Sequence, residues 1–506
     1  KESAQENSSS MRTIDLIIIF GYLIGITALG IWSAGKQETT EDYFVGDRSV
    51  PWWAIAMSIV ATETSTITFI SVPGIVFAKG GNFEFLQLVF GYLLGRVVIS
   101  LIFIPLYFQG KLQTVYQLLG ERFGGGVKIL TSSLFVIMRC IADGIRLLLT
   151  AIVLSAVYIS FQPQADPALI IIGSILLLGT VMIIFTFYGG MEAVIWIEVV
   201  QLIIYIGGAL AAAIVLLQNI DGGLTTALQI GREFSKFNLL DFTFDVTKTY
   251  TFWGGLIGGC FLTMSTHGTD QFLVQRYLCT DKSRDAVFAL LVSGIVVLLQ
   301  FIGFLFIGVL LFSFYKPFQL DGYALASGAF PFTSGDRVFP DFITQHMPAG
   351  LSGLVVAAIF AAALSSSLNS IAATAVNDIY KPFAKNAGDK HLVRVAGILT
   401  IVSGIVQILV AVSLRNANSS ALNLALAVAS LINGPVLGVF LVGTLLKRAS
   451  EIHALAGMLV STSVMLYILL ATPIAWPWYA FIGSAITILV AFASSLVIPG
   501  KLNTEK

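Results

Sequence analysis

The strongest constraint on the fold of this chain is a series of hydrophobic runs, each long enough to cross a lipid bilayer. They cover residues 14–34, 51–78, 84–108, 127–160, 167–188, 192–217, 250–276, 286–314, 347–379, 393–414, 420–445, 452–471 and 476–498. Since backbone polar groups find no water in lipid, runs of this length form helices. Of the 506 residues, 57% are apolar and only 11% are charged. The sequence therefore predicts an all-α polytopic membrane protein with about 13 transmembrane helices.

The distribution of basic residues predicts the orientation of these helices. An odd number of spans places the two termini on opposite sides of the membrane, and Lys and Arg concentrate in inner loops. With the N-terminus outside, the inner loops and the C-terminus collect most of the 28 Lys and Arg, among them Arg48 and Arg276. The short outer loops hold only Lys79 and Arg415, and Lys236 falls in a longer outer stretch at about 218–249. We expect an integral protein of the plasma membrane (in a bacterium, the inner membrane) with the N-terminus outside and the C-terminus cytoplasmic.

The domain organisation is expected to be simple. Residues 13–498 form one transmembrane domain, residues 1–12 are interpreted as a disordered tail or a cloning remnant, and 499–506 form a C-terminal tail. The motifs GxxxxGK(S/T), HExxH and GxSxG are absent, so we expect no enzyme and no ATP-driven pump. No basic tract indicates a nucleic-acid partner. The expected partners are a small solute, an ion and lipid, and the protein is expected to be a monomer.

A polar stretch interrupts the second hydrophobic run. The segment 58–74 reads SIVATETSTITFISVPG and contains Thr62, Glu63, Thr64, Ser65, Thr66 and Thr68. Polar residues with Pro and Gly inside a span are tolerated where the freed backbone lines a cavity within the protein, and unwound carbonyls there can coordinate a cation. Packing contacts between helices are the alternative interpretation.

Several charged side chains fall inside predicted spans: Arg96, Arg139, Arg146, Glu63, Asp143, Glu198 and Asp270. Each costs about 2.5–3.5 kcal/mol at the bilayer centre and needs a partner or a wet cavity. On the helix at 127–160, Arg139, Asp143 and Arg146 share one face. They form either a self-neutralising stripe or the polar wall of a substrate cavity. The cluster AAALSSSLNS at 361–370 has two possible interpretations as well, a contact between helices through small residues or a functional site.

Four separated motifs resemble the sodium/solute symporter family, which includes sodium-coupled sugar, sialic acid, proline, pantothenate and iodide transporters. They are EDYFVGDRSVPWWAIAMSIVATETS (41–65), TFYGGMEAVIWIEVVQ (186–201), HGTDQFLVQRYL (267–278) and LSSSLNSIAATAVNDIY (364–380). The resemblance runs from about residue 14 to 498. It implies thirteen helices, ten of them in two inverted five-helix repeats (a LeuT-type core) at about 51–217 and 250–414. It also implies alternating access driven by a sodium gradient.

The resemblance implies two sodium sites. The common site would use main-chain carbonyls of Ala61 and Thr64, but Ala362 and Ala363 stand where the family has its two hydroxyl ligands. This site is therefore expected to be weakened unless the carboxylate of Glu63 compensates.

The second site, present in part of the family, maps to Glu198, Ser365 and Ser366. The family more often has Asp at the position of Glu198, whose side chain is one methylene longer. This assignment favours a functional interpretation of the serine cluster.

The resemblance also implies a set of solute contacts: Ser65, Thr68, Phe83, Gln87, Thr263, Thr266 and His267. Hydroxyls, an amide, an imidazole and an aromatic ring suit a neutral polyhydroxyl compound. The arginine that binds a carboxylate in sialic acid transporters falls at Ala142. Arg139 and Arg146 lie one turn to either side of it, beside Asp143, so an organic anion is a second option.

These observations support three hypotheses. The first is sodium-coupled symport of a small polar organic solute, a sugar or a sugar derivative. The second keeps the fold but couples to protons through Glu63, Asp143 and Glu198, since buried carboxyl groups can take up and release protons near neutral pH. The third is a membrane solute sensor that does not transport.

Overall fold

A computed structural model describes residues 2–32, 38–64, 66–162, 164, 166–363, 367–384, 386–417, 427 and 431–499. Over these residues the chain forms helices joined by loops, and no β-sheet. Seven described helices are long and apolar enough to cross a membrane, or eight if one bent pair counts as a single span. The predicted all-α membrane protein is therefore confirmed, whereas the count of thirteen spans stays a prediction.

The long helices correspond to most of the hydrophobic runs. They are α1 (Glu2–Trp32), α5 (Leu86–Tyr107), α7 (Gly125–Phe161), α8 (Pro167–Asn219), α12 (Ser283–Tyr315), α16 (Asp389–Ser413), α19 (Glu451–Ala471) and α20 (Tyr479–Val497). The backbone of α1 includes most of the predicted tail at 1–12, and its apolar part begins at Thr13.

Shorter helices complete the chain between and around these spans. The α-helices are α2 (Thr40–Val45), α3 (Trp52–Glu63), α4 (Thr66–Phe77), α6 (Tyr116–Phe123), α9 (Gly223–Glu233), α10 (Gly259–Gly268), α11 (Gln271–Tyr277), α13 (Gly335–Gln345), α14 (Leu351–Ala363), α15 (Leu368–Thr374) and α18 (Asn433–Leu445). The 3₁₀ turns are η1 (Gly46–Arg48), η3 (Pro317–Gln319) and η5 (Trp476–Trp478). Two segments, η2 (Gly254–Gly258) and η4 (Ala375–Tyr380), are π-helical.

Two of the predicted interruptions are visible in the backbone. Within α8, Gly190 has φ 58° and ψ −159°, a conformation that residues with a side chain rarely adopt, so the two runs predicted at 167–188 and 192–217 join there at a kink. The run at 51–78 is broken into α3 and α4, whose axes differ by 60°. Between them Thr64 is extended, with φ −81° and ψ 103°. The polar stretch therefore marks a broken helix, as predicted.

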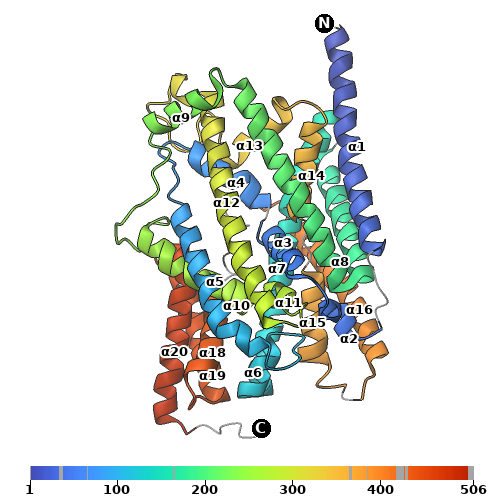
Figure 1. Cartoon of the computed structure of the whole chain (residues 1–506), viewed down its shortest axis with the longest axis vertical. Helices are drawn as coiled ribbons and strands as arrows, with labels where there is room; N and C mark the ends of the chain where they lie inside the picture. Colours follow the sequence, from blue (N-terminus) through green and yellow to red (C-terminus); the bar gives the residue numbers. More distant parts are fainter. Residues whose placement is uncertain are drawn as a thin grey trace.

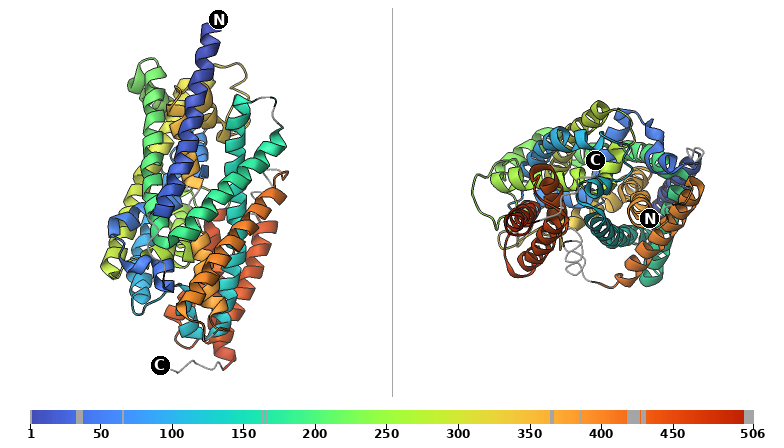
Figure 2. Two further views of the ribbon diagram at one scale, coloured as in Figure 1. Left: turned by 90° about the vertical axis from the view of Figure 1, so that its right-hand side faces the viewer. Right: turned by 90° about the horizontal axis from the view of Figure 1, so that it is seen from below.

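The broken helix lies at the centre of the molecule. The α3 half packs against α8, α11 and α12, and the α4 half packs against α12 and α13 (Figure 1). Helix α1 lies along the outside, beside α8 and α14, and α18, α19 and α20 form a group on one side (Figures 1 and 2). Helix α1 starts at one end of the molecule and α20 finishes at the opposite end (Figure 1).

Three basic residues that the sequence placed in loops are buried. Arg48 donates to the carbonyl of Leu112 (2.7 Å), and Lys236 donates to the carbonyl of Ala78 (2.7 Å) just beyond the end of α4. Burial lowers the pKa of Lys236 to about 8. Arg276, counted among the inner-loop charges, belongs to α11 and is 0% exposed. The loop assignment of Arg276 is therefore wrong, because α11 folds back against α3.

Helices α5 and α10 approach each other closely through glycines. A methyl group added at Gly91 would collide with the backbone oxygen of Gly255 and come within 2.8 Å of Cα of Gly259. Gly303 in α12 offers a contrast, since nothing lies within 4 Å of a methyl group there.

We predict opposite effects of two Gly→Ala changes on thermal stability. Gly91→Ala should lower the midpoint of thermal unfolding, because overpacking costs about 1–3 kcal/mol. Gly303→Ala should leave it unchanged or raise it, since Ala is favoured over Gly in helices by about 1 kcal/mol. Tryptophan fluorescence of the purified protein in detergent follows both transitions. Equal midpoints for the two variants would contradict the close contact between α5 and α10.

Candidate functional site

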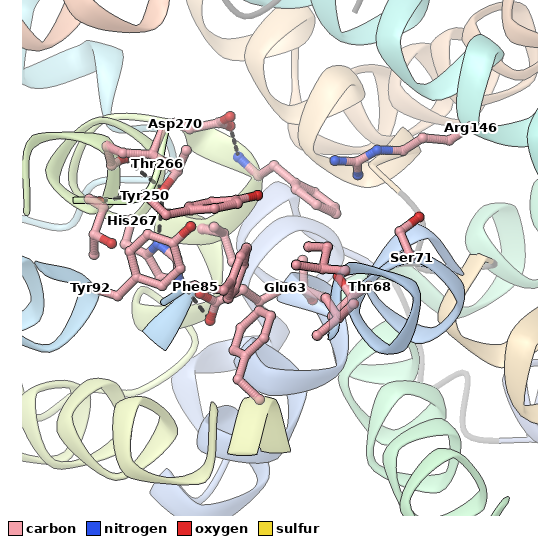
Figure 3. Close-up of a pocket in the computed structure, with 18 of the residues that line it drawn as sticks. Glu63, Thr68, Ser71, Phe85, Tyr92, Arg146, Tyr250, Thr266, His267 and Asp270 are labelled. Atoms are coloured by element: carbon pink, nitrogen blue, oxygen red, sulfur yellow. Dashed lines mark hydrogen bonds and ion pairs between the residues drawn. The ribbon is translucent and has the colours of Figure 1, made fainter. Parts of the chain in front are cut away.

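A cavity of about 430 Å³ lies beside the break between α3 and α4 (Figure 3). Its wall combines three kinds of side chain. The charged or titratable ones are Glu63, Arg139, Arg146, His267 and Asp270. The hydroxyl groups belong to Thr62, Thr68, Ser71, Thr263 and Thr266, and the rings to Phe85, Tyr92, Tyr250, Phe272 and Phe301. A concave site with rings and a few polar groups suits a small polar organic molecule.

The structure brings together most of the predicted solute contacts. Six of them line the cavity: Thr68, Thr263, Thr266, His267, Arg139 and Arg146. Ser65 lies outside the described residues. Asp143, Phe83 and Gln87 are not among the residues that line the cavity.

Phe83 and Gln87 instead contact the long loop that follows α9. Gln87 is 1% exposed; its amide nitrogen donates to the carbonyl of Glu84 (3.1 Å), and its amide oxygen accepts from the backbone N–H of Asp241 (2.8 Å). The Phe83 ring packs edge-on against Phe237, with centroids 5.4 Å apart. A role of Gln87 as a solute ligand stays a prediction, and its contacts are those of a residue that positions the start of α5.

One end of the cavity holds a network of three titratable groups from three helices. Arg96 of α5 donates to the carboxylate of Glu63, the last residue of α3, and lies 3.3 Å from Nε2 of His267 in α10. The His267 nitrogen is also 3.4 Å from Oε2 of Glu63, and its Nδ1 is 3.0 Å from the Thr266 hydroxyl. Glu63, proposed above as a compensating sodium ligand, is thus ion-paired with the buried Arg96. This network fixes the orientation of His267 in the wall.

The charged stripe of α7 forms another part of the wall. Arg139 donates to Asp143 (2.9 Å), lies 3.6 Å from the carboxylate of Asp270, and stacks 3.8 Å above the ring of Phe272. Arg146 is held more loosely, because its nearest carboxylate oxygen, on Asp143, is 3.7 Å away and its side chain is 43% exposed. Asp143 therefore pairs with both arginines of the stripe, and Arg139 and Arg146 line the cavity. A role of the stripe as the wall of a substrate cavity stays a prediction.

Glu198, the predicted ligand of the second sodium site, lies in α8 and is 1% exposed. Its carboxylate accepts from the guanidinium of Arg276, from the Ser58 hydroxyl and from the Thr62 hydroxyl (3.0 Å). Ser365 and Ser366 lie outside the described residues. A sodium ion at Glu198 stays a prediction, and in this arrangement it would share the carboxylate with an arginine.

Reasoning from the sequence missed the role of Arg276. The only signal was indirect: Glu198 lies in a span without a basic residue one turn away on its own helix. A buried carboxylate of that kind needs a partner from another helix.

The predicted common sodium site is defined only in part. Ala61 is buried in the last turn of α3, and Thr64 follows the end of that helix. The Thr64 hydroxyl donates to the carbonyl of Val60 (2.7 Å) and accepts from the amide of Gln300 (2.7 Å). The side chains of Ala362 and Ala363 lie outside the described residues. The site stays a prediction.

Comparison with known proteins places this geometry in context. The sequence model of the Sodium:solute symporter family matches residues 43–461. The chain belongs to this family. Membership confirms the family predicted from the four motifs, and with it sodium as the coupling ion.

Two curated relatives match the symporter over nearly its whole length. The Sodium/sialic acid symporter NanT of Aliivibrio fischeri is 30% identical over 99% of this chain and 96% of its own. The Sodium/sialic acid symporter SiaT of Proteus mirabilis is 30% identical over 96% of both chains. Both relatives are transporters and not enzymes.

Solved structures agree with this grouping. The substrate-bound outward-open state of a Na⁺-coupled sialic acid symporter superposes with a TM-score of 0.83 at 29% identity, covering 97% of this chain and 99% of that one. The nucleobase-cation-symport transporter Mhp1 superposes with a TM-score of 0.54 at 13% identity, covering 91% of this chain and 95% of that one. The second likeness is one of fold alone.

We predict that the Glu198–Arg276 pair is needed as a unit. Glu198→Gln alone leaves a buried guanidinium without its counter-charge, which costs about 3–5 kcal/mol, whereas replacing both partners by uncharged groups is often nearly neutral. Glu198→Gln should therefore lower the thermal midpoint strongly, and the double variant Glu198→Gln/Arg276→Met should recover most of the loss. A double-mutant cycle on thermal unfolding measures the coupling.

The exposed pair of Lys316 and Asp221, 3.5 Å apart, provides the control. Asp221→Asn should change stability by less than about 1 kcal/mol. If Glu198→Gln is as harmless as Asp221→Asn, the buried pair does not form in the protein. The role of Glu198 in sodium-dependent uptake is best measured in the double variant, because loss of folding does not obscure the effect there.

Proposed function

We propose that the symporter carries a sugar derivative with a carboxylate group, of the sialic acid type, into the cell together with sodium. The proposal concerns the solute, since sodium coupling follows from the family. The single observation that carries it is the guanidinium of Arg146, which faces the cavity and, among the described residues, has no carboxylate oxygen closer than 3.7 Å (Figure 3). The relatives NanT and SiaT, both named as sialic acid symporters, support the same class of solute.

Arg146 is the cavity arginine best able to bind a solute. A guanidinium can form two parallel hydrogen bonds to a carboxylate, a geometry that favours organic anions over neutral sugars. Arg139 already contacts Asp143 and Asp270, and it stacks on Phe272. The side chain of Arg146, by contrast, is 43% exposed.

The rest of the wall suits a sugar ring. The hydroxyls of Thr263 and Thr266 can bond to ring hydroxyls, and the rings of Phe85, Tyr92 and Tyr250 offer apolar faces. A neutral polyhydroxyl solute would use the same groups without Arg146. The carboxylate contact is therefore the feature that separates the two classes of solute.

We further propose the architecture expected of the family. The domain would comprise 13–498, with thirteen spans and two inverted five-helix repeats at about 51–217 and 250–414, acting by alternating access as a monomer in the bilayer. The broken helix at the start of the first repeat and the likeness in fold to Mhp1 support this. The proposed topology, with the N-terminus outside, is consistent with the start of α1 and the end of α20 lying at opposite ends of the molecule (Figure 1).

We predict sodium-driven uptake of N-acetylneuraminic acid by the protein in liposomes, with little uptake of galactose. Arg146→Ala should raise the KM for the acid about 10- to 100-fold, because a hydrogen-bonded pair with a charged group contributes about 1.5–3 kcal/mol. Arg232→Ala, at an exposed arginine of α9, is the control and should have no effect. Unchanged kinetics in Arg146→Ala, or preferential uptake of galactose, would contradict the proposed solute.

The same liposomes test the ion. Uptake should follow an imposed sodium gradient at constant pH. Uptake driven by a pH gradient at constant sodium would instead favour the proton-coupled alternative.

A further inference from the structure

A second polar cluster lies apart from the cavity, where η4 packs against α7 and meets the start of α6. It consists of Asp378 in η4, Thr114 just before α6, and Ser132 in α7, and each of these residues is 0% exposed. The π-helical turn of η4 contributes to this placement, because its wider turn directs both Asn377 and Asp378 into the interior. Such π-helical turns occur frequently at functional sites. Helices α6 and α15 lie toward the end of the molecule where α20 finishes (Figure 1).

The polar atoms of this cluster have no partners in the described part of the chain. Both carboxylate oxygens of Asp378 lack a hydrogen bond, as do the hydroxyls of Thr114 and Ser132. The two hydroxyls are the polar groups that flank the carboxylate, and they interact with it more weakly than a hydrogen bond of normal length and angle would. Among the described residues, Lys128, one turn before Ser132 on α7, attracts the carboxylate electrostatically but forms no ion pair with it.

Asp378 differs in this respect from the other buried acids. Of the described residues, only Asp15, Glu198 and Asp378 are acids classed as buried. Asp15 accepts from the backbone N–H groups of Gly350 (2.6 Å) and Gly353 (2.8 Å), and Glu198 pairs with an arginine. A buried carboxylate without donors or a counter-charge is strongly unfavourable. Asp378 therefore requires a bound cation or a proton.

We infer that Asp378, Thr114 and Ser132 form a further sodium site, distinct from the one predicted at Glu198. One carboxylate balances a single positive charge, and hydroxyl oxygens are hard ligands of the kind that bind Na⁺. Divalent cations use more oxygen ligands or retain several waters. In the proposed topology the site lies on the inner side, and it binds sodium on its way to the cytoplasm.

Equilibrium binding of ²²Na⁺ to the purified protein, without any solute, tests this inference. Asp378→Asn should bind one sodium ion fewer per protein than the wild type. Ser132→Ala and Thr114→Val should each weaken one class of site about tenfold, as expected for the loss of a single ligand in a buried site. Because no solute is present, the result does not depend on the solute proposed above.

Thr131→Val is the matched control. Thr131 neighbours Ser132 on α7 and is equally buried, but its hydroxyl already donates to the carbonyl of Val127 (2.8 Å). The Thr131→Val change should leave sodium binding unchanged, and so should Lys128→Met.

Three results would overturn the inference. The first is unchanged sodium stoichiometry and affinity in Asp378→Asn. The second is a neutral carboxyl stretching band, absent in Asp378→Asn, in the infrared spectrum of the sodium-loaded wild type, since this means that the group holds a proton. The third applies if Asp378→Asn does not fold, so that only Ser132→Ala and Thr114→Val can be tested. If both of these variants then bind sodium as tightly as Thr131→Val does, the site is excluded.

Discussion

Much of this structure depends on the pairing of charges inside an apolar molecule. Arg276 and Glu198 come from α11 and α8, and the hydroxyls of Ser58 and Thr62 on α3 complete the set of donors to one carboxylate. A charge in this environment is tolerated only with a partner, so the pair links three helices at a defined distance and orientation. It holds the straight half of the broken helix against α8 while the backbone beyond Thr64 changes direction.

Helix α3 consequently serves two regions of the symporter. One face presents Ser58 and Thr62 to the carboxylate of Glu198, and its last residue, Glu63, reaches the cavity and pairs with Arg96. An ion that altered the pairing at Glu198 would therefore act on the same short helix that lines part of the cavity proposed to bind the solute. Coupling of this kind is reciprocal, since each ligand must change the affinity for the other by the same factor. The close connection of the two regions gives a physical basis for sodium-driven transport.

The candidate site was predicted unevenly from the sequence. The hydroxyls of Thr263 and Thr266 and the imidazole of His267, which the family resemblance implied, line the cavity. Arg139 and Arg146 line it too, and helical spacing had placed these two on one face of α7. Gln87 does not line the cavity, since its contact with Asp241 depends on how a long loop folds over α5. Arg276 was assigned to a loop because it is the last residue of the hydrophobic run at 250–276. No pattern in the sequence singles out Asp378, because its unusual feature is the absence of hydrogen-bond partners among the described residues. Only the positions of the other helices reveal this feature.

The sequence by itself determined the class of the protein, the approximate extent of most helices, an interruption within 58–74, the division between the runs at 167–188 and 192–217, and the family. These properties depend on local patterns: the length of an apolar run, the helical repeat, and motifs of consecutive residues. Only the tertiary structure decided which charges pair. Glu198 meets Arg276 across 78 residues and Arg96 meets Glu63 across 33. Such pairings depend on how whole helices pack, because a side chain reaches only a few ångströms, and no local pattern in the sequence specifies which distant helix lies within that reach.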